Sequence, residues 1–400
     1  MSYCLISYLD IRVDGSNFRA GGSSNRQFNC SDTQMFGVDE FLTQKSAVWS
    51  NFVMVKKILI LIFLFSWVSL IGQNVLKGRL IDSISNEPIE YALLYIDGST
   101  KSTTSNTEGM FSFTIPNLPA QIEVSHLNYQ PMSLFVEVEM VTDDVVTIAM
   151  APRENILDDV LILDKRTRQE YLNRFKEEFL GVDYWGRHAK LLNDDCLLFS
   201  RDERKLSVSA TEPLVVDMPK LGYQVSVDLL KFVTESHSFN TSSATIVAKY
   251  HFEDVSNRDK KIANNRKEVY FNSRQHFLRS LFRDQLLENG FNMFENFSDT
   301  ASQQVTSAPV DLGDSLIRID DRIKLINLKD HEYQILYYSK KGYPLDLTKH
   351  KPKSSYEPSS LHFRVDSIYV FSDGTSPSSD IRFSGHMGIK RVGAMLPSDY

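Results

Sequence analysis

The stretch Val75-Leu76-Lys77-Gly78-Arg79-Leu80-Ile81 alternates apolar and polar positions, and this period of two predicts a β-strand. Turn residues (Asn, Asp, Gly and Pro) separate it from the short apolar runs that follow. Further strands are expected at 89–96, 110–115, 122–125, 134–138 and 145–150. Several short strands at a spacing of about 8–12 residues are typical of a sandwich or barrel. We therefore predict one small Greek-key β-sandwich over residues 74–152.

Two turns between these strands have residues with a specific structural use. Asp97-Gly98 is typical of a hairpin turn. Gly109 is expected to take a positive φ, where it has no Cβ to clash, and Asn106 to hydrogen-bond the backbone two residues further on. Phe111 is expected to be the first inward residue of the next strand. We assign structural roles to these five residues.

The same residues carry a resemblance to the carboxypeptidase-regulatory-like domain. The similar motifs are Gly78-x-Leu80-x-Asp82, Pro88-Ile89-x-Tyr91-Ala92, Asp97-Gly98-Ser99-Thr100, Thr104-x-Asn106-x-x-Gly109-x-Phe111 and Ser125-x-Leu127-x-Tyr129. The resemblance implies a transthyretin-like sandwich, a module found in exported proteins of Gram-negative bacteria and ahead of many TonB-dependent outer-membrane receptors. It implies no peptidase activity, because the module has no zinc site of its own.

A candidate export signal precedes the predicted sandwich. Met54-Val55-Lys56-Lys57 is followed by an apolar run at 58–71 that is too short to span a bilayer, which takes about 20 residues. A short basic start and such a run describe a secretory signal, with cleavage expected near Gly72 and Gln73. Residues 54–72 are thus expected to be a signal peptide, and 1–53 a disordered or spurious upstream extension. The alternative is a cytoplasmic N-terminus with a buried core helix at 58–71.

Composition limits the function classes. The chain has 400 residues, 42% hydrophobic and 24% charged, and at roughly 100–200 residues per domain this suggests two or three domains. A net charge of −7 argues against a general nucleic-acid binder. After residue 53 the sequence holds one cysteine, Cys196, which is expected to be a small buried hydrophobe rather than a nucleophile.

Residues 153–166 are expected to form a connector, and 167–400 an α+β domain of unknown function, within a mainly β chain. Apolar spacing predicts one helix from Tyr171 to Leu180, stopped by Gly181, and a second over 274–289, capped by Gly290. Predicted strands lie at 196–199, 205–210, 223–233, 245–252, 332–338 and 361–371. Polar stretches at 298–307, 350–360 and 372–380 are predicted loops.

Two surfaces in this region could bind a ligand. Basic and aromatic residues interleave over Arg274–Arg283, and a helix with a solvated basic outer face explains them better than an RNA or anion surface. A tyrosine cluster is read as amphipathic strand residues, with glycan or peptide binding as the alternative. Its members are Tyr333, Tyr337, Tyr338 and Tyr343.

The search for catalytic chemistry finds no constellation in the sequence. Oxygens of Asp97, Asn106 and Glu108 suggest a calcium loop, but their spacing does not fit an EF-hand, so a structural role is favoured. His331-Glu332 lacks the second histidine that a zinc helix needs. A Gly-x-Ser-x-Gly elbow and a phosphate loop are also missing. We predict no catalytic residue, metal or cofactor.

These observations favour a non-enzymatic exported envelope protein that binds or scaffolds a protein or polymer. One alternative is a periplasmic hydrolase with an unrecognised site in the C-terminal domain. Another is an accessory protein of a TonB-dependent outer-membrane transporter, with an outer-membrane receptor as partner. The expected location is the periplasm or the periplasmic face of the outer membrane, with no nucleic-acid partner and no transmembrane helix in the mature chain.

The signal peptide can be tested on the natural protein. N-terminal sequencing is expected to find a mature chain that starts at Gln73 or Asn74, because the signal is removed near Gly72. A protein that starts at Met1, or that retains residues 58–71 in a packed core, would contradict the export argument.

Overall fold

The structure is a computed structural model, and it describes residues 56, 74–142, 144–153, 163–237, 241–257, 259–299, 302–305, 310, 312–328, 332–338, 357–363, 365–376 and 381–400. The chain divides into residues 1–72 and a compact unit, Gln73–Tyr400. The predictions for 1–53, the apolar run at 58–71, Gly72 and Gln73 lie outside the described residues. All of the packed cores described below belong to the compact unit.

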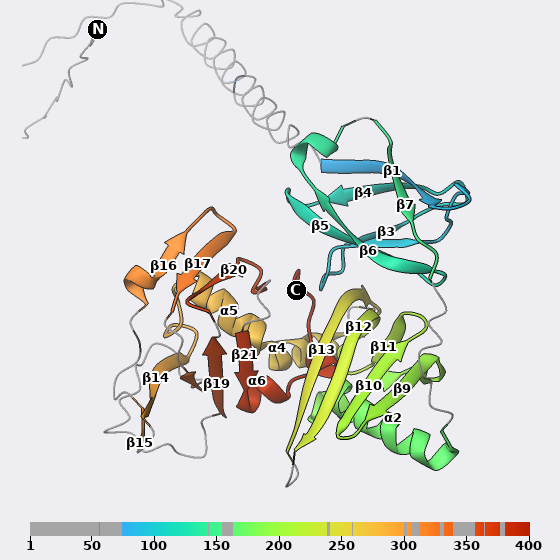
Figure 1. Cartoon of the computed structure of the whole chain (residues 1–400). Coiled ribbons are helices and arrows are strands. Elements are labelled where there is room, and N and C mark those ends of the chain that lie inside the picture. Colours follow the sequence, from blue (N-terminus) through green and yellow to red (C-terminus); the bar gives the residue numbers. More distant parts are fainter. Residues whose placement is uncertain are drawn as a thin grey trace, which may run out of the picture. The chain divides into compact units, whose positions relative to one another are not determined.

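The N-terminal part of this unit is the expected β-sandwich (Figure 1). One sheet has the order β4-β1-β7, from β1 (Asn74–Asp82), β4 (Met110–Ile115) and β7 (Val146–Met150). The other has the order β3-β2-β5-β6, from β2 (Leu93–Tyr95), β3 (Ser102–Thr104), β5 (Ala120–His126) and β6 (Tyr129–Val136). The period of two in β1 buries Leu76 and Leu80 between the sheets, against Phe111 and Val124.

A third sheet follows the two sheets of the sandwich and is covered on one face by a helix. Long strands β12 (Tyr223–His237) and β13 (Thr241–Asp254) form its hairpin. On its other side β12 pairs with β11 (Leu214–Met218) and β10 (Lys205–Ala210), which pair in turn with β8 (Lys190–Leu191) and β9 (Leu197–Asp202). Helix α2 (Lys165–Leu180) packs Phe175 and Phe179 onto this sheet. A short helix, α3 (Tyr184–His188), follows α2.

The remainder packs two further sheets against helices. One sheet has the order β15-β14-β18-β19-β21, and the other β16-β17-β20. Their strands are β14 (Phe291–Asp299), β15 (Ser302–Val305), β16 (Leu316–Arg318), β17 (Ile323–Asn327), β18 (Glu332–Tyr337), β19 (Glu357–Phe363), β20 (Ser367–Phe371) and β21 (Ile381–Ser384). Their helices are α5 (Arg274–Phe282) and α6 (Gly385–Ile389). Phe277 and Leu281 of α5 enter the core of these sheets. Helix α4 (Lys260–Tyr270) precedes α5 and places Val269 in the core of the β12 sheet.

The mainly β fold with an α+β C-terminal part is confirmed, but several boundaries were wrong. The predicted helix over 274–289 ends at Phe282, because Asp284 has a φ of 56°. Gly290 does take a positive φ, 87°, yet it precedes β14 instead of capping α5. There a Cβ would lie 2.3 Å from the carbonyl oxygen of Tyr338, so the close approach of the backbone requires glycine.

Some strand predictions also fail. The apolar run 361–371 is two strands of different sheets, β19 and β20. The predicted loop 298–307 contains the end of β14 and all of β15. The strand predicted over 89–96 is only β2, because Tyr91 has a φ of 58° that interrupts the extended backbone.

The packing of α2 generates a stability prediction. Phe175 is fully buried, with its ring 4.9 Å from Phe179 and 4.7 Å from Phe232 between centroids. Phe175→Ala is expected to lower the free energy of unfolding by about 4 kcal/mol, because the cavity adds to the lost transfer energy. Urea denaturation of residues 73–400 measures this. The exposed neighbour Glu177 is the control, and a similar loss in Glu177→Ala would refute the assignment of the buried face.

Candidate functional site

The turn residues lie on two separate loops of the sandwich. Asn106 Oδ1 accepts hydrogen bonds from the backbone N–H of Glu108 (3.0 Å) and Met110 (2.8 Å). Gly109 has a φ of 73°, and a Cβ there would lie 2.4 Å from the carbonyl oxygen of Leu80. Phe111 is buried in the sandwich core. This turn thus uses its polar atoms internally.

The other loop, with Asp97 and Gly98, reaches out of the sandwich to the edge of β13. Gly98 N–H donates to the carbonyl of Tyr250 (2.7 Å), and Tyr250 N–H donates to Asp97 Oδ1 (2.8 Å). Phe252 N–H donates to the carbonyl of Ser99 (3.0 Å), within a parallel bridge. The oxygens of Asp97 and Asn106 therefore serve different partners. Among the described residues, no group of three or more His, Cys, Asp or Glu could hold a metal ion.

A polar seam, buried except at the half-buried Asp97 and Lys249, lies between the sandwich sheet and the β12–β13 hairpin. We define it as Tyr95, Asp97, Glu123, Ser125, Asp228 and Lys249. Asp228 of β12 is 5% exposed. Its Oδ2 accepts from the Tyr95 hydroxyl (2.7 Å) and its Oδ1 from the Ser125 hydroxyl (2.8 Å). Both donors come from the sandwich, so Asp228 ties the two layers together.

Lys249 is the cation of the polar seam, directly across from Asp228 in the β12–β13 ladder. Its Nζ lies 3.0 Å from Glu123 Oε1 and 3.3 Å from Asp97 Oδ2. Glu123 is 4% exposed, and its Oε2 also accepts from the Ser133 hydroxyl (2.6 Å). A buried charge is tolerated when it is paired and hydrogen-bonded, and Glu123 meets both conditions.

Burial dominates the electrostatics of the polar seam. It raises the pKa of Asp228, and the hydrogen bonds from Tyr95 and Ser125 oppose this rise only in part. It also raises the pKa of Asp97, against the Tyr250 N–H and the Lys249 charge. The pKa of Lys249 is lowered by burial but raised more by Glu123 and Asp97, so its net shift is upward. Lys249 is therefore held as a cation.

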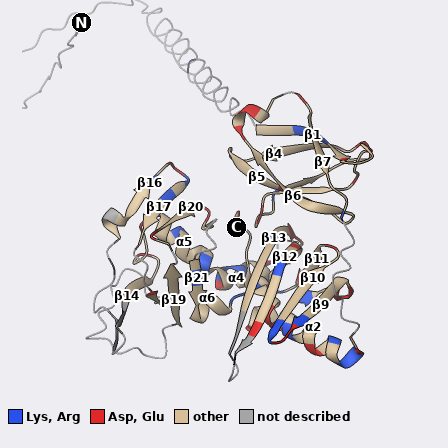
Figure 2. Ribbon diagram, viewed as in Figure 1, with Lys and Arg blue, Asp and Glu red and all other residues tan. Residues whose placement is uncertain are grey.

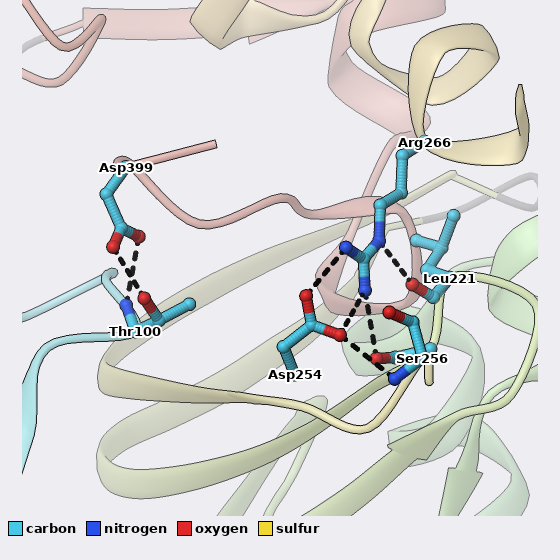
Figure 3. A network of polar contacts seen from close by, with 7 residues as sticks. Thr100, Leu221, Asp254, Ser256, Arg266 and Asp399 are labelled. Carbon is cyan, nitrogen blue, oxygen red and sulfur yellow. Dashed lines mark hydrogen bonds and ion pairs between the residues drawn. The ribbon is translucent and has the colours of Figure 1, made fainter. Parts of the chain in front are cut away.

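The C-terminal residues connect the sandwich loop with Gly98 to α5 by hydrogen bonds. Asp399 accepts from the Thr100 N–H (3.0 Å) and hydroxyl (2.5 Å), as Figure 3 shows. Arg279 of α5 donates to the carbonyls of Ser398 (2.9 Å) and Tyr400 (3.2 Å). Ser398 N–H in turn donates to the carbonyl of Gly98 (2.7 Å). The sandwich loop is thus held by β13 and by the C-terminal segment.

A second cluster in Figure 3 fixes α4 to the ends of β12 and β13. Arg266 is 9% exposed and donates to both oxygens of Asp254, at 2.8 and 2.9 Å. It also donates to the carbonyls of Leu221 (2.7 Å) and Gly222 (3.0 Å), and lies over the Tyr223 ring. The hydrogen bonds of Arg266 hold the pKa of Asp254 well below its usual range.

Helix α5 agrees in part with its predicted solvated basic face. Arg274 is exposed as expected, and it donates to the carbonyls of Met387 and Lys390, both at 3.2 Å. Arg279 is instead half-buried. Arg279 donates to the carbonyl of Asp373 (2.9 Å) as well as to the C-terminal segment. These arginines therefore join α5 to neighbouring segments of the C-terminal part. On other elements, such as α2, residues of both charges lie along the helix, as Figure 2 shows.

The remaining residues of interest are dispersed. Cys196 is half-buried, its thiol donates to the carbonyl of Asn193, and burial raises its pKa to about 11, so it is protonated at neutral pH. The His251 ring lies 5.6 Å from that of Tyr95, and burial lowers its pKa. Tyr333 is buried in the core, whereas His331 and Tyr343 lie outside the described residues.

The polar seam was not among the sites predicted from the sequence. Its residues come from strands that were predicted, but partners such as Tyr95 and Asp228 are 133 positions apart. One signal was present, since Asp228 and Lys249 are charges between apolar neighbours within predicted strands. Charges there need partners from a neighbouring layer.

Comparison with known proteins agrees with the sandwich. Residues 76–162 match the family model of the CarboxypepD_reg-like domain. This confirms the resemblance stated for this part of the chain, and the matched domain is a non-catalytic fold. No curated protein matches the chain in a sequence comparison.

The raised pKa of Asp228 generates a prediction for stability against pH. Its folded-state pKa lies above its unfolded one, so the native state binds the proton more tightly, and stability rises as pH falls through the folded value. Relative to Asp228→Asn, which does not titrate, the wild type is expected to gain free energy of unfolding on acidification from pH 7 towards pH 4. Urea titrations across this range measure the difference.

Asp164, the N-cap of α2, is a control because its pKa shift is opposite to that of Asp228. The hydroxyl and N–H of Thr167 hold its pKa below the usual range, so its contribution is lost as pH falls. The wild type should therefore lose its advantage over Asp164→Asn on acidification. The same trend in both comparisons would contradict the assignment for Asp228.

Proposed function

We propose that this chain is a non-enzymatic exported envelope protein whose sandwich binds a protein partner. The CarboxypepD_reg-like match supports a non-catalytic role for the sandwich, and the apolar run at 58–71 supports export. In the part of the chain that the structure describes, no helix is long and apolar enough to cross a membrane.

The observation that carries the proposal is the distribution of exposed apolar side chains. Among the described residues, the most exposed large hydrophobics all lie in the sandwich: Ile84 (79%), Tyr91 (68%), Val138 (62%), Leu127 (57%) and Phe135 (57%). The C-terminal part also has exposed hydrophobics, such as Leu192 (55%) and Val182 (54%), but the largest exposed fractions gather on one module, as is typical of an interaction surface. This favours binding by the sandwich over chemistry in the C-terminal part.

Two of these residues lie at the same end of the sandwich. The Asp82 carboxylate accepts from the N–H of Ile84 (2.7 Å) and from the hydroxyl of Tyr129 (2.9 Å). Tyr129 begins β6, directly after the β5–β6 turn that holds Leu127. Asp82 thus holds the Ile84 loop beside the Leu127 turn, and we propose this end as the centre of the binding surface.

The polar seam supports the same role in a different way. The outer face of β2 and β5 contacts the β12–β13 hairpin through Tyr95, Glu123 and Ser125. A module anchored by buried hydrogen bonds loses less orientational freedom on binding than one on a flexible linker. The C-terminal part is then a base that presents the sandwich to its partner.

A capture experiment with matched variants tests the proposal. Residues 73–400 are immobilised, and proteins retained from an envelope extract of the source bacterium are quantified. The double variant Ile84→Ser, Leu127→Ser is expected to retain the partner at least about tenfold less, because buried apolar anchors dominate interface energies.

The control variant removes apolar side chains of similar exposure from the C-terminal part. Val182 and Leu192 are 54% and 55% exposed, and Val182→Ser with Leu192→Ser should leave capture unchanged. Equal losses in both variants, or no protein enriched by the wild type, would overturn the proposal. Recovery of an outer-membrane receptor would assign the protein to transport.

A further inference from the structure

Strand β13 forms the outer edge of its sheet (Figure 1). On one side it pairs with β12 from Thr241 to Asp254. On the other side, backbone hydrogen bonds from the described residues reach it at Tyr250 and Phe252, from the loop with Gly98 and Ser99. The edge is therefore closed at its C-terminal half by the sandwich.

The backbone groups of the other half point away from β12. In an antiparallel ladder, the N–H and C=O groups of alternate residues face opposite sides. Tyr250 and Phe252 face outwards, since they bond the sandwich loop, so Ala248, Ile246 and Ala244 face outwards as well. Among the described residues, no hydrogen bond reaches the outward groups of these three.

This open edge also lacks the usual features that prevent pairing. Native sheets protect exposed edges with charges, prolines or bulges on the edge strand. Residues 241–248, Thr-Ser-Ser-Ala-Thr-Ile-Val-Ala, contain no charge, proline or glycine. The bulge of the hairpin is at Leu229/Lys231 on β12, and Val247 is 45% exposed. An edge of this composition is a template for another strand.

We infer that the open half of β13 pairs, antiparallel, with the same segment of a second copy of this chain. A two-fold axis at Ile246 would place Ile246 opposite itself, Ala244 opposite Ala248, and Thr245 opposite Val247. The symmetric register uses every outward group from 244 to 248 and opposes no like charges. The pairs Thr245–Val247 are β-branched, which favours cross-strand packing.

The extent of the open edge favours this occupant over a longer foreign peptide. Pairing cannot continue beyond Lys249, because Tyr250 and Phe252 are already bonded to the sandwich loop. Lys249 itself is neutralised within the polar seam and points no free charge at a second copy. The inference concerns a surface other than the proposed partner-binding end, so the two can fail independently.

Cysteine pairing tests both the dimer and its register. Thr245→Cys and Val247→Cys are made separately in residues 73–400 with Cys196→Ser, so that each protein has one thiol. A mixture of the two variants is expected to form a disulfide dimer on mild oxidation, because opposite residues fall within disulfide range. Each variant alone should not, because its own copies are diagonal neighbours about 7–8 Å apart.

Light scattering measures the mass of the unmodified protein and of a matched variant. The wild type is expected to have twice the mass of one chain, and Ala248→Pro the mass of one chain. Proline at 248 removes only an outward N–H, so the ladder with β12 is kept, and circular dichroism and thermal unfolding verify the fold. A monomeric wild type, or cross-linking that does not depend on the mixture, would overturn the inference.

A third comparison separates register from chance collision. Lys205 is exposed on β10 of the same sheet, and a mixture of Lys205→Cys with Thr245→Cys gives the background rate of disulfide formation. The Thr245→Cys and Val247→Cys mixture should cross-link at least about tenfold faster, because only it meets the geometric range of a disulfide. Equal rates would refute pairing along β13.

Discussion

The carboxylate of Asp228 is the constraint on which the arrangement of the compact unit depends. It lies on β12, where it is removed from water, and its hydrogen-bond donors are the hydroxyls of Tyr95 and Ser125 in the sandwich. An unpaired carboxylate in this position would carry a large desolvation cost. Because polar groups, unlike apolar ones, must meet at defined distances and angles, this seam fixes how the sandwich lies on the hairpin.

Further hydrogen bonds beside the Asp228 contact hold the same sandwich loop. The loop with Gly98 meets the edge of β13, and Ser398 and Asp399 then bond the same loop from the far side. Arg279 of α5 holds the carbonyl of Ser398, so the C-terminal segment connects the third core to the sandwich. The surfaces left open, the apolar end of the sandwich and half of β13, are those that this chain of contacts does not reach.

Most strands and α2 could be predicted from local patterns, because a period of two or of 3.6 can be recognised in consecutive residues. The local patterns failed where contacts with distant residues determine the structure. Helix α4 has a mostly polar sequence, and its clearest tie is Arg266, which binds carbonyls before β12 and the Asp254 carboxylate. The run 361–371 reads as one strand, but the bend at Asp366 sends its halves to different sheets. The role of Asn106 could be predicted because its side chain bonds N–H groups of its own turn. The bonds of Asp97 and Gly98 to β13 could not. The polar seam could not, since its partners meet only in the folded chain.

The closure of the polar seam bears directly on function. A catalytic carboxylate needs an oxygen free to meet substrate, and a general base needs access to the proton that it removes. Both oxygens of Asp228 are occupied by hydroxyls, and Glu123 is shared between Lys249 and Ser133. The raised pKa of Asp228 comes with burial in an interface, which structural networks produce as readily as active sites. Fixed polar contacts of this kind specify one orientation of two modules. Binding is then expected at the exposed sandwich end and at the edge of β13.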